Sequence, residues 1–380
     1  YPDGSAYAGN DQYRNYNFIN RLEYRRSWRE HDLDFMVGFH WQQSDNQYFS
    51  VFGRNFASDD LRNIDSASEI TAGAGGETSW AFAGYFSRLN YMFRERFLLT
   101  LTGRLDGSSR FGASNRYGFF PAVSAGWIIS DEKWYGLPGI DFLKLRAGVG
   151  QTGNAEIGNF AALGLVDFGH NYNDRPGGRL SQLANPDLKW EKTTQIDAAL
   201  EFGLRESRIR GSVGYYLKDT RDLLLHVPIS PVNGFTSYLD NFGRVENRGW
   251  EFELSADLVR GEFLWNSSFN LATLRNEVKR LVDGQDRIFR NNMLREGEPL
   301  GVFYMVRYHG VNPENGNAQW LDRDGNVTET YSSAHRVIAG SPFPDFFGGF
   351  TNTFSWKGID LRVFFQYQVG NKIYRDDGSF

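Results

Sequence analysis

Residues 33–41 read LDFMVGFHW and decide the fold class, because a large apolar side chain occupies every second position. A period of two places these side chains on one face of a β-strand and their neighbours on the other face. The same period recurs in four further segments, at residues 99–106, 190–202, 250–258 and 360–368. Strands of about ten residues can cross a bilayer when they are tilted. The sequence therefore predicts an all-β protein whose strands each have one apolar face.

The composition of the 380 residues supports this interpretation and excludes several classes of protein. Aromatic residues make up 16% of the chain, yet the hydrophobic fraction is 41% and the mean hydropathy is −0.50. No apolar run approaches the ~18 residues of a membrane helix. The absence of cysteine excludes disulfides, Cys zinc sites and thiol catalysis. The net charge of −5, without a block of Lys and Arg, predicts no nucleic-acid partner.

The connections between the predicted strands alternate between short and long. Short turns are predicted at residues 94–96, 204–207, 259–261 and 357–358, and long polar loops at 43–79, 151–188, 221–244 and 275–299. Outer-membrane barrels have short periplasmic turns and long outer loops. The direction of each strand then leaves no place for a spanning strand at 300–310. We expect this segment to belong to a large outer-loop assembly or to pair with a neighbour there. The count gives about twelve spanning strands, of which 346–356 runs from the outside inward.

Aromatic residues lie near many of the predicted strand ends. The set comprises Trp28, Trp41, Trp80, Phe97, Trp190, Phe263 and Trp356. Such positions are typical of the aromatic girdles that mark the two membrane interfaces. Aromatic residues also favour β-strands in general, so the pattern leaves both explanations open.

Eight short segments along the chain together carry a family resemblance. They are AGYFSRLNY (83–91), FLLTLTGRLDGSSRFG (97–112), YGFFPAVSAGW (117–127), LKLRAGVGQTGN (143–154), NPDLKWEKTT (185–194), NRGWEFE (247–253), GEPLGVFY (297–304) and GSPFPDFFGG (340–349). In this order they resemble the SusC/RagA family of TonB-dependent outer-membrane transporters. The resemblance extends from about Asn17 to Tyr374.

The resemblance implies a larger protein than the segments cover. The family has an N-terminal plug and a 22-stranded antiparallel transmembrane barrel, and only the middle-to-late barrel is matched here. Residues 1–380 are accordingly interpreted as a partial outer-membrane β-barrel domain without a plug, with further strands expected on both sides. Residues 1–10 are predicted to be turn-like, and 376–380 do not alternate as a terminal strand would.

The same resemblance implies a transporter and not an enzyme. It predicts a multi-pass protein of the bacterial outer membrane that imports oligosaccharides or oligopeptides with energy from the TonB complex. The implied partners are a SusD-like surface lipoprotein that acts as a lid, the TonB complex acting through a plug, the outer-membrane lipid and the substrate. The family commonly pairs two transporters with two lids, so a dimer of such pairs is a further expectation.

Two other classes of protein also fit the composition. A secreted soluble β-rich protein that binds or degrades glycans would explain the aromatics, and it predicts apolar faces buried against a second sheet. A passive porin-like barrel would need neither plug nor lid. Glu251, Glu253 and Asp257 share a strand face at a spacing that a glycosidase could use. Because this alternation recurs on most strands, we interpret these carboxylates as part of a polar lumen wall.

Substrate-binding candidates lie on a polar strand face and in the glycine-rich segment that follows it. Arg104 and Asp106 are predicted to pair across the lumen, touch the plug or line the substrate path. Arg110 and Phe111 lie in segment 107–112, which does not precede a helix and so is interpreted as a structured loop and not as a phosphate cradle.

Exposed aromatic side chains in the loops are the remaining substrate candidates. Phe111, Tyr172, Phe235 and Tyr238 are predicted to stack on sugar faces or to cover peptide side chains. The loops at 151–188 and 221–244 are therefore the predicted sites of ligand or lid contact.

One segment has the spacing of the start of a calcium loop. Asp322, Asp324 and Asn326 place oxygen ligands at positions one, three and five, with a glycine for the bend. The acid expected near position twelve is absent, and Glu329 would substitute only in a different geometry. A plain Asp/Asn/Gly turn is the alternative. If the calcium loop forms, a structural calcium ion is the only cofactor that the sequence predicts.

Overall fold

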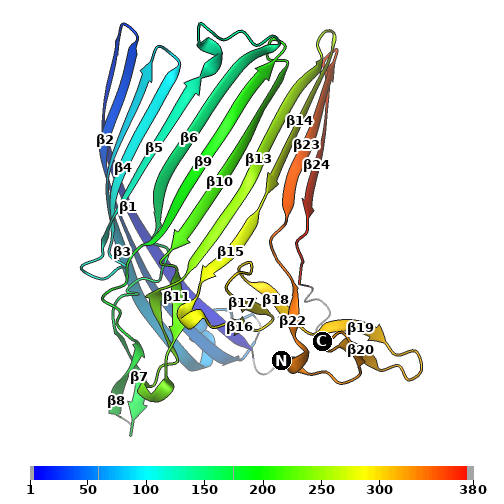
Figure 1. The fold of residues 1–380 in the computed structure, drawn as a ribbon. Helices are drawn as coiled ribbons and strands as arrows, with labels where there is room; N and C mark the ends of the chain where they lie inside the picture. Colours follow the sequence, from blue (N-terminus) through cyan, green and yellow to red (C-terminus); the bar gives the residue numbers. More distant parts are fainter. Residues whose placement is uncertain (1–3, 59, 174, 375–380) are drawn as a thin grey trace.

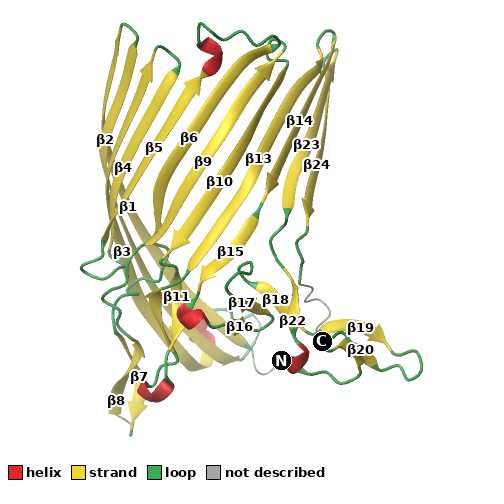
Figure 2. Cartoon of the chain, in the orientation of Figure 1, coloured by secondary structure: helices red, strands yellow, loops and turns green. Residues whose placement is uncertain are grey.

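The computed structural model describes residues 4–58, 60–173 and 175–374, which form antiparallel β-structure with short 3₁₀-helices in the connections (Figures 1 and 2). Within these residues twelve strands pair edge to edge in one path, which confirms the predicted number of about twelve. The path comprises β1 (Ser5–Trp28), β2 (His31–Phe56), β3 (Ala67–Phe93), β4 (Phe97–Ser108), β5 (Tyr117–Ile128), β6 (Ile140–Asn154), β9 (Glu191–Leu204), β10 (Ile209–Arg221), β13 (Arg244–Val259), β14 (Phe263–Thr273), β23 (Phe346–Trp356) and β24 (Ile359–Val369). We call this sheet the wall.

The predicted short turns lie at one end of the wall and the three longest connections at the other. The end at the top of Figure 1 carries the turns 29–30, 94–96, 205–208, 260–262 and 357–358, and also a longer connection at 129–139. We call this the turn end. The opposite end, the loop end, carries the connections 57–66, 109–116, 155–190, 222–243 and 274–345. Lys357 and Gly358 both have positive φ, at 47° and 84°, as the tightest hairpin turns require.

The predicted long loop at 43–79 is wrong in extent. β2 and β3 stay paired from His31 opposite Phe93 to Phe56 opposite Ala67, which leaves only 57–66 as the connection. The glycines and polar residues of this segment suggest a loop locally, but cross-strand pairing satisfies their backbone groups. β1 likewise begins at Ser5 inside the segment predicted to be turn-like. Residues 1–3 and 375–380 lie outside the described residues, so the prediction for 376–380 stays open.

The connections at the loop end contain small sheets of their own. β7 (Leu165–Tyr172) pairs with β8 (Arg175–Gln182), and β11 (Leu224–Pro228) pairs with β12 (Ser237–Asn241). The connection 274–345 contains β15 (Arg275–Arg280), β16 (Arg287–Phe289), β17 (Asn292–Leu294), β18 (Val302–Met305), β19 (Arg307–Val311), β20 (Ala318–Leu321), β21 (Val327–Thr328) and β22 (Val337–Gly340). The 3₁₀-helices are η1 (Ile64–Ser66), η2 (Ile129–Asp131), η3 (Pro231–Asn233), η4 (Val282–Gly284) and η5 (Ser333–His335).

The placement of residues 300–310 is confirmed. β18 belongs to the four-stranded sheet β16-β17-β18-β22 and β19 to the three-stranded sheet β19-β20-β21, so neither is a strand of the wall. β15 is an intermediate case, because it pairs with β13 beside the end of β14 and extends the wall toward the loops (Figure 1).

Alternation gives the wall two chemically different faces. On β4, Leu101 and Leu105 lie on one face and are each 40% exposed, whereas Arg104 and Asp106 lie on the other. Cross-strand pairing continues the division, since Leu105 lies opposite the exposed Tyr85. We call these the apolar face and the polar face. A soluble sandwich would bury the apolar face against a second sheet, but here its large side chains are exposed.

The most deeply buried side chains lie at the loop end and not in the wall. Among the described residues the bulkiest fully buried ones are Phe111, Leu188, Met293, Val278 and Val302. Each lies in a connection or in a short strand of one. The core of this structure therefore consists of loops packed on one another and on the end of the wall. No helix in the described residues is long and apolar enough to span a membrane.

Aromatic side chains do gather at the turn end. Trp28 stacks on His31 with ring centroids 5.1 Å apart, and Phe97 stacks on Trp127 at 6.2 Å. Phe263 lies opposite Trp356 in the ladder between β14 and β23.

The prediction that Trp190 belongs to an aromatic girdle at the membrane interface, by contrast, is wrong. Its side chain is only 4% exposed and donates from Nε1 to the Arg116 carbonyl oxygen at 2.9 Å, so it belongs to the buried core of the loop end. Trp41 and Trp80 lie within the long strands β2 and β3.

Candidate functional site

The loop end contains a compact apolar cluster that fixes two connections against the wall. The cluster, which we call the loop core, consists of Phe111, Phe120, Ala161, Ala162, Leu188 and Trp190. The Trp190 ring lies 4.9 Å from the Phe111 ring and 5.3 Å from the Phe120 ring. Gly112 packs so closely that a Cβ there would lie 1.7 Å from the Pro186 carbonyl oxygen. These contacts hold the connections 109–116 and 155–190 in place through protein contacts alone.

Phe111 is therefore not the exposed aromatic that the sequence predicts. Its side chain is 2% exposed, because the glycine-rich loop folds it inward onto Trp190. Phe111 therefore stabilises the loop core and has no exposed ring face on which a ligand could stack. A glycine-rich polar segment gives no local sign of this burial, since the partners lie about 80 residues away in the sequence.

The other predicted aromatics differ in exposure. Tyr172 is 85% exposed at the end of β7. Phe235 and Tyr238 are half-buried in the connection 222–243, and the Tyr238 hydroxyl donates to Asp240 Oδ2 at 3.0 Å. Tyr172 thus has the largest free surface for stacking, whereas Tyr238 is oriented by its hydrogen bond. Their role in substrate binding stays a prediction.

Arg104 and Asp106 form a two-bonded ion pair on the polar face. Arg104 Nε and Nη2 each donate to one oxygen of Asp106 at 3.0 Å. The Asp106 side chain is 11% exposed and the Arg104 side chain 44%. Gly84 makes room for the acid, since a Cβ there would lie 2.5 Å from Asp106 Oδ1. The pair therefore forms within one strand and presents a positioned guanidinium on the polar face.

Arg110 joins three segments of the loop end. Its Nε donates to Asn159 Oδ1 at 2.9 Å, its Nη1 donates to the Ala155 carbonyl oxygen at 3.1 Å, and its guanidinium lies 4.7 Å from the Trp80 ring. Burial lowers the pKa of the guanidinium from its ordinary value. With these groups taken up by protein partners, Arg110 holds the connection 155–190 in place.

The two connections predicted to contact ligand or lid are joined to each other. Asn185 Nδ2 donates to the Leu239 carbonyl oxygen at 2.9 Å and to Asp240 Oδ1 at 3.1 Å. Asn241 exchanges two hydrogen bonds of 2.7 Å with the backbone of Lys189. Connections 155–190 and 222–243 are therefore joined by four hydrogen bonds and form one assembly.

The structure reveals an apolar groove that the sequence did not predict. We call it the loop groove; its volume is about 450 Å³ and it lies between the β11–β12 hairpin and the segment around β16. It is lined by Leu224, Leu225, His226, Pro228, Ser237, Leu281, Val282, Arg287, Ile288, Phe289 and Leu294. The two walls are about 60 residues apart in the sequence. The only local signal is short apolar runs, such as Leu223–Leu225, inside otherwise polar connections.

A second hollow of about 600 Å³ lies along β6, β9, β10, β13 and β14. Charged side chains line it, among them Arg146, Glu201, Arg210 and Glu253. Glu201 accepts from Arg146 Nε at 3.0 Å and lies 3.4 Å from Lys144 Nζ. Glu201 is thus neutralised by neighbouring cations on the same face, as expected for a carboxylate of a polar lining.

The segment with calcium-loop spacing adopts a turn. Asp322 Oδ1 accepts from the backbone N–H groups of Asp324 and Asn326 at 2.9 and 2.8 Å. Glu329 accepts instead from the side chains of Asn312, Asn315 and Asn317. Across residues 4–58, 60–173 and 175–374, no group of three or more His, Cys, Asp or Glu side chains is placed to hold a metal ion. The calcium site stays a prediction without geometric support.

Comparison with known proteins adds a family to this geometry. The model of the family described as TonB dependent receptor-like, beta-barrel matches residues 1–378. TonB-dependent receptor P39 of Formosa agariphila is 32% identical over 96% of this chain, and TonB-dependent receptor SusC of Bacteroides thetaiotaomicron is 33% identical over 93%. This chain spans only 40% and 37% of the length of these two relatives.

A solved structure of the RagAB peptide transporter is similar over 97% of this chain and 42% of its own, with a TM-score of 0.89 and 28% identity. The closeness of the match extends over the wall and the loop-end connections together, because nearly the whole chain is aligned.

Proposed function

This chain belongs to the TonB-dependent receptor-like β-barrel family and is of the SusC/RagA type, and we propose that it forms the middle-to-late wall of an outer-membrane nutrient importer. The observation that carries the proposal is the separation of short turns and folded long loops to opposite ends of one antiparallel wall. By analogy with outer-membrane barrels, the loop end of the wall faces the outside of the cell and the turn end faces the periplasm. The apolar face contacts lipid, and the polar face lines the passage.

The energy for import comes from the TonB complex through a plug that the full-length protein supplies. The chain then contributes walls and loops and no chemical step. A SusD-like lipoprotein would close the loop end from outside. The joined connections 155–190 and 222–243 are suited to this role, because hydrogen bonds between them let both contact the lid as one surface.

The imported substrate is an oligosaccharide or an oligopeptide, and the loop groove favours the peptide. Sugars are usually bound by aromatic faces and by polar partners for their hydroxyl groups. The groove is instead lined mainly by aliphatic side chains, including Leu225, Leu281 and Ile288. Such a lining matches an apolar peptide side chain, since burying a hydroxyl group without a partner is costly. The RagAB structure to which this chain is similar is described as a peptide transporter.

The proposal is tested by extracting the full-length protein from outer membranes in mild detergent and identifying by mass spectrometry what copurifies. We expect a SusD-like lipoprotein together with bound peptides. Glycans in place of peptides would reject the substrate class and keep the importer. Recovery in the soluble fraction without detergent would reject the importer itself.

A matched pair of substitutions tests the groove. Ile288→Asp places a charge in the groove, whereas Val232→Asp places the same charge at a 94% exposed position of the neighbouring connection. We expect peptides to be lost from the first variant and retained by the second. Equal retention in both would show that the groove does not hold the peptide.

A further inference from the structure

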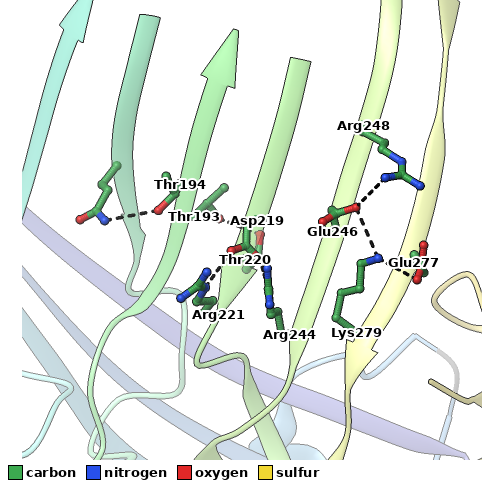
Figure 3. A network of polar contacts seen from close by, with 11 residues as sticks. Thr193, Thr194, Asp219, Thr220, Arg221, Arg244, Glu246, Arg248, Glu277 and Lys279 are labelled. Carbon is green, nitrogen blue, oxygen red and sulfur yellow. Dashed lines mark hydrogen bonds and ion pairs between the residues drawn. The ribbon is translucent and has the colours of Figure 1, made fainter. Parts of the chain in front are cut away.

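A row of polar side chains crosses five neighbouring strands at one level of the wall. In the ladders, Gln151 lies opposite Thr194, Thr194 opposite Asp219, Asp219 opposite Glu246, and Glu246 opposite Glu277. Figure 3 labels four members of this row, from Thr194 to Glu277, together with Arg221, Arg244, Arg248 and Lys279. Three carboxylates therefore stand side by side on β10, β13 and β15. Like charges directly opposite one another destabilise a sheet, so this row requires compensation.

The row lies on the same side of the wall as the apolar face. It marks the level at which apolar side chains give way to charged ones toward the loop end. Asp219 and Glu246 are four residues from Tyr215 and Trp250, a number of steps that keeps side chains on the same face. Tyr215 and Trp250 are 37% and 48% exposed, and their rings lie 5.1 Å apart. The opposite face of the same segment buries Val245 and Val278 under the connections. The carboxylates thus face outward, away from the passage.

Five cations surround the three carboxylates and neutralise them. Arg221 and Arg244 donate from Nε to Asp219 at 2.7 and 2.6 Å. Arg248 and Lys279 lie 3.4 and 3.5 Å from Glu246. Glu277 lies 2.7 Å from Lys279 and 3.9 Å from Arg275. We call these eight residues the charged belt, namely Asp219, Arg221, Arg244, Glu246, Arg248, Arg275, Glu277 and Lys279.

The acids of the charged belt are more covered than its cations, of which Lys279 is the least exposed at 27%. The side chains of Asp219, Glu246 and Glu277 are 11%, 13% and 18% exposed. Those of Arg221 and Arg275 are 62% and 69% exposed. Five cations against three carboxylates leave a local charge of +2 in a chain whose net charge is −5. The belt therefore presents positioned guanidinium groups outward on an anchored acidic row.

We propose that the charged belt binds the phosphate groups of anionic lipid headgroups in the outer leaflet of the membrane, an inference that rests on the proposed function for the orientation of the wall. Guanidinium groups form strong, geometrically specific hydrogen bonds with phosphate. The occupant is a lipid because the belt continues the lipid-facing apolar face. The row that contains Asp219 lies two residues along the strands from the apolar row Val149, Ile196 and Leu217. An anionic headgroup also supplies the charge that complements the belt.

The test uses the full-length protein in detergent, titrated with bisphosphorylated lipid A and followed by native mass spectrometry with EDTA present. Removing the exposed cations in the variant R221Q/R244Q/R275Q should weaken binding by about tenfold or more, because each cation near an anionic lipid surface contributes severalfold. Raising the salt concentration should weaken binding to the unmodified protein as well. Zwitterionic phosphatidylethanolamine should bind the variant and the unmodified protein equally.

A matched variant controls for the loss of charge. R29Q/R205Q/K357Q removes three cations from the turns at the other end of the wall and should bind lipid A like the unmodified protein. A second variant, E246Q/E277Q, removes two covered acids and should bind lipid A as tightly or more tightly. Weaker binding by this variant, despite its higher positive charge, would show that the charge of the belt does not drive lipid binding, which overturns the proposal.

The remaining outcomes separate this proposal from the proposed function. Equal lipid A binding by R221Q/R244Q/R275Q and the unmodified protein would reject the belt as a lipid site and leave the importer intact. Loss of a copurifying protein from this variant, with lipid binding unchanged, would assign the belt to a protein contact instead. A protein that needs no detergent would reject the importer and the belt together.

Discussion

Leu101 and Leu105 in the wall are each 40% exposed, whereas Phe111 and Leu188 at the loop end are 2% and 0% exposed. All four are large apolar residues, but the first pair lies in a strand of the wall and the second pair in connections, and the two pairs differ in what covers them. The wall is held by backbone ladders, and no other part of the described chain covers these apolar side chains, which the proposed function places against lipid. The loop end is held by side chains that cover one another, as in a soluble core. The loops are therefore pre-formed, and their arrangement depends on packing that the membrane does not provide.

The largest effect should follow from breaking the loop core. Trp190→Ala removes a ring that contacts both Phe111 and Phe120, and such truncations in cores cost about 3–5 kcal/mol. Hydrogen exchange in the full-length protein should show lost protection across 155–190. Leu105→Ala, on the exposed apolar face, should leave that segment protected. Equal exchange in both variants would contradict the division between wall and loop core.

Filling the close contact at Gly112 should have the next largest effect. Gly112→Ala forces Pro186 to move, because the added Cβ would lie 1.7 Å from its carbonyl oxygen, and overpacking of this kind costs about 1–3 kcal/mol. Gly136→Ala is the control, since nothing lies within 4 Å of a Cβ there. Proteolysis should cut 109–116 and 155–190 faster in the first variant only. A resistant Gly112→Ala protein would show that the two connections are not locked together here.

Breaking the hydrogen bonds between the two large connections should have a smaller effect. Asn185→Ala removes the donor to Leu239 and Asp240 and leaves a carbonyl oxygen unpaired, which costs about 1–3 kcal/mol when the group is buried. Exchange should rise in 222–243 while β10 and β13 stay protected. If only 155–190 responds, the two connections are independent, and the assembly proposed for the lid contact is wrong.

The smallest effect is a dependence on pH in the β19–β21 sheet. Hydrogen bonds from Asn312, Asn317 and Asn315 lower the pKa of Glu329 from 4.5 to about 2. Because the folded pKa is depressed, the stabilisation is fully present above pH 4.5 and is lost as the pH falls toward 2. Exchange protection of Asn312 and Asn317 should therefore persist at pH 4 and fade near pH 2. The variant Glu329→Gln should show no such transition, and a transition in it would assign the effect to another group.

The wall could be predicted from the sequence because its signal is local. A period of two identifies each strand, and counting directions correctly excluded residues 300–310 from the wall. The same local reasoning failed where long-range pairing decides the structure. Residues 43–79 contain many loop-forming residues, yet they mostly extend β2 and β3 because each strand supplies the partner of the other.

The candidate site was harder to predict from the sequence, because its contacts also join residues that are far apart in the chain. Segment 107–112 indicated a structured loop, but nothing near Phe111 reveals that Trp190 would cover it. The loop groove combines residues from β11 and β16 that are about 60 positions apart, and its short apolar runs become meaningful only when the connections are folded together. Arg104 and Asp106 were correctly placed on a polar strand face, but their pairing with each other depends on the space left by Gly84.

The orientation of the wall is the central claim, and cysteine labelling in intact cells tests it most directly. In the full-length protein, with any other cysteines replaced, Tyr172→Cys places a single thiol at the loop end and Lys357→Cys places one at the turn end. A membrane-impermeant maleimide should label the first thiol in intact cells and the second only after the outer membrane is permeabilised. Labelling of Lys357→Cys alone in intact cells, or of both thiols equally, would contradict a wall whose loop end faces outward.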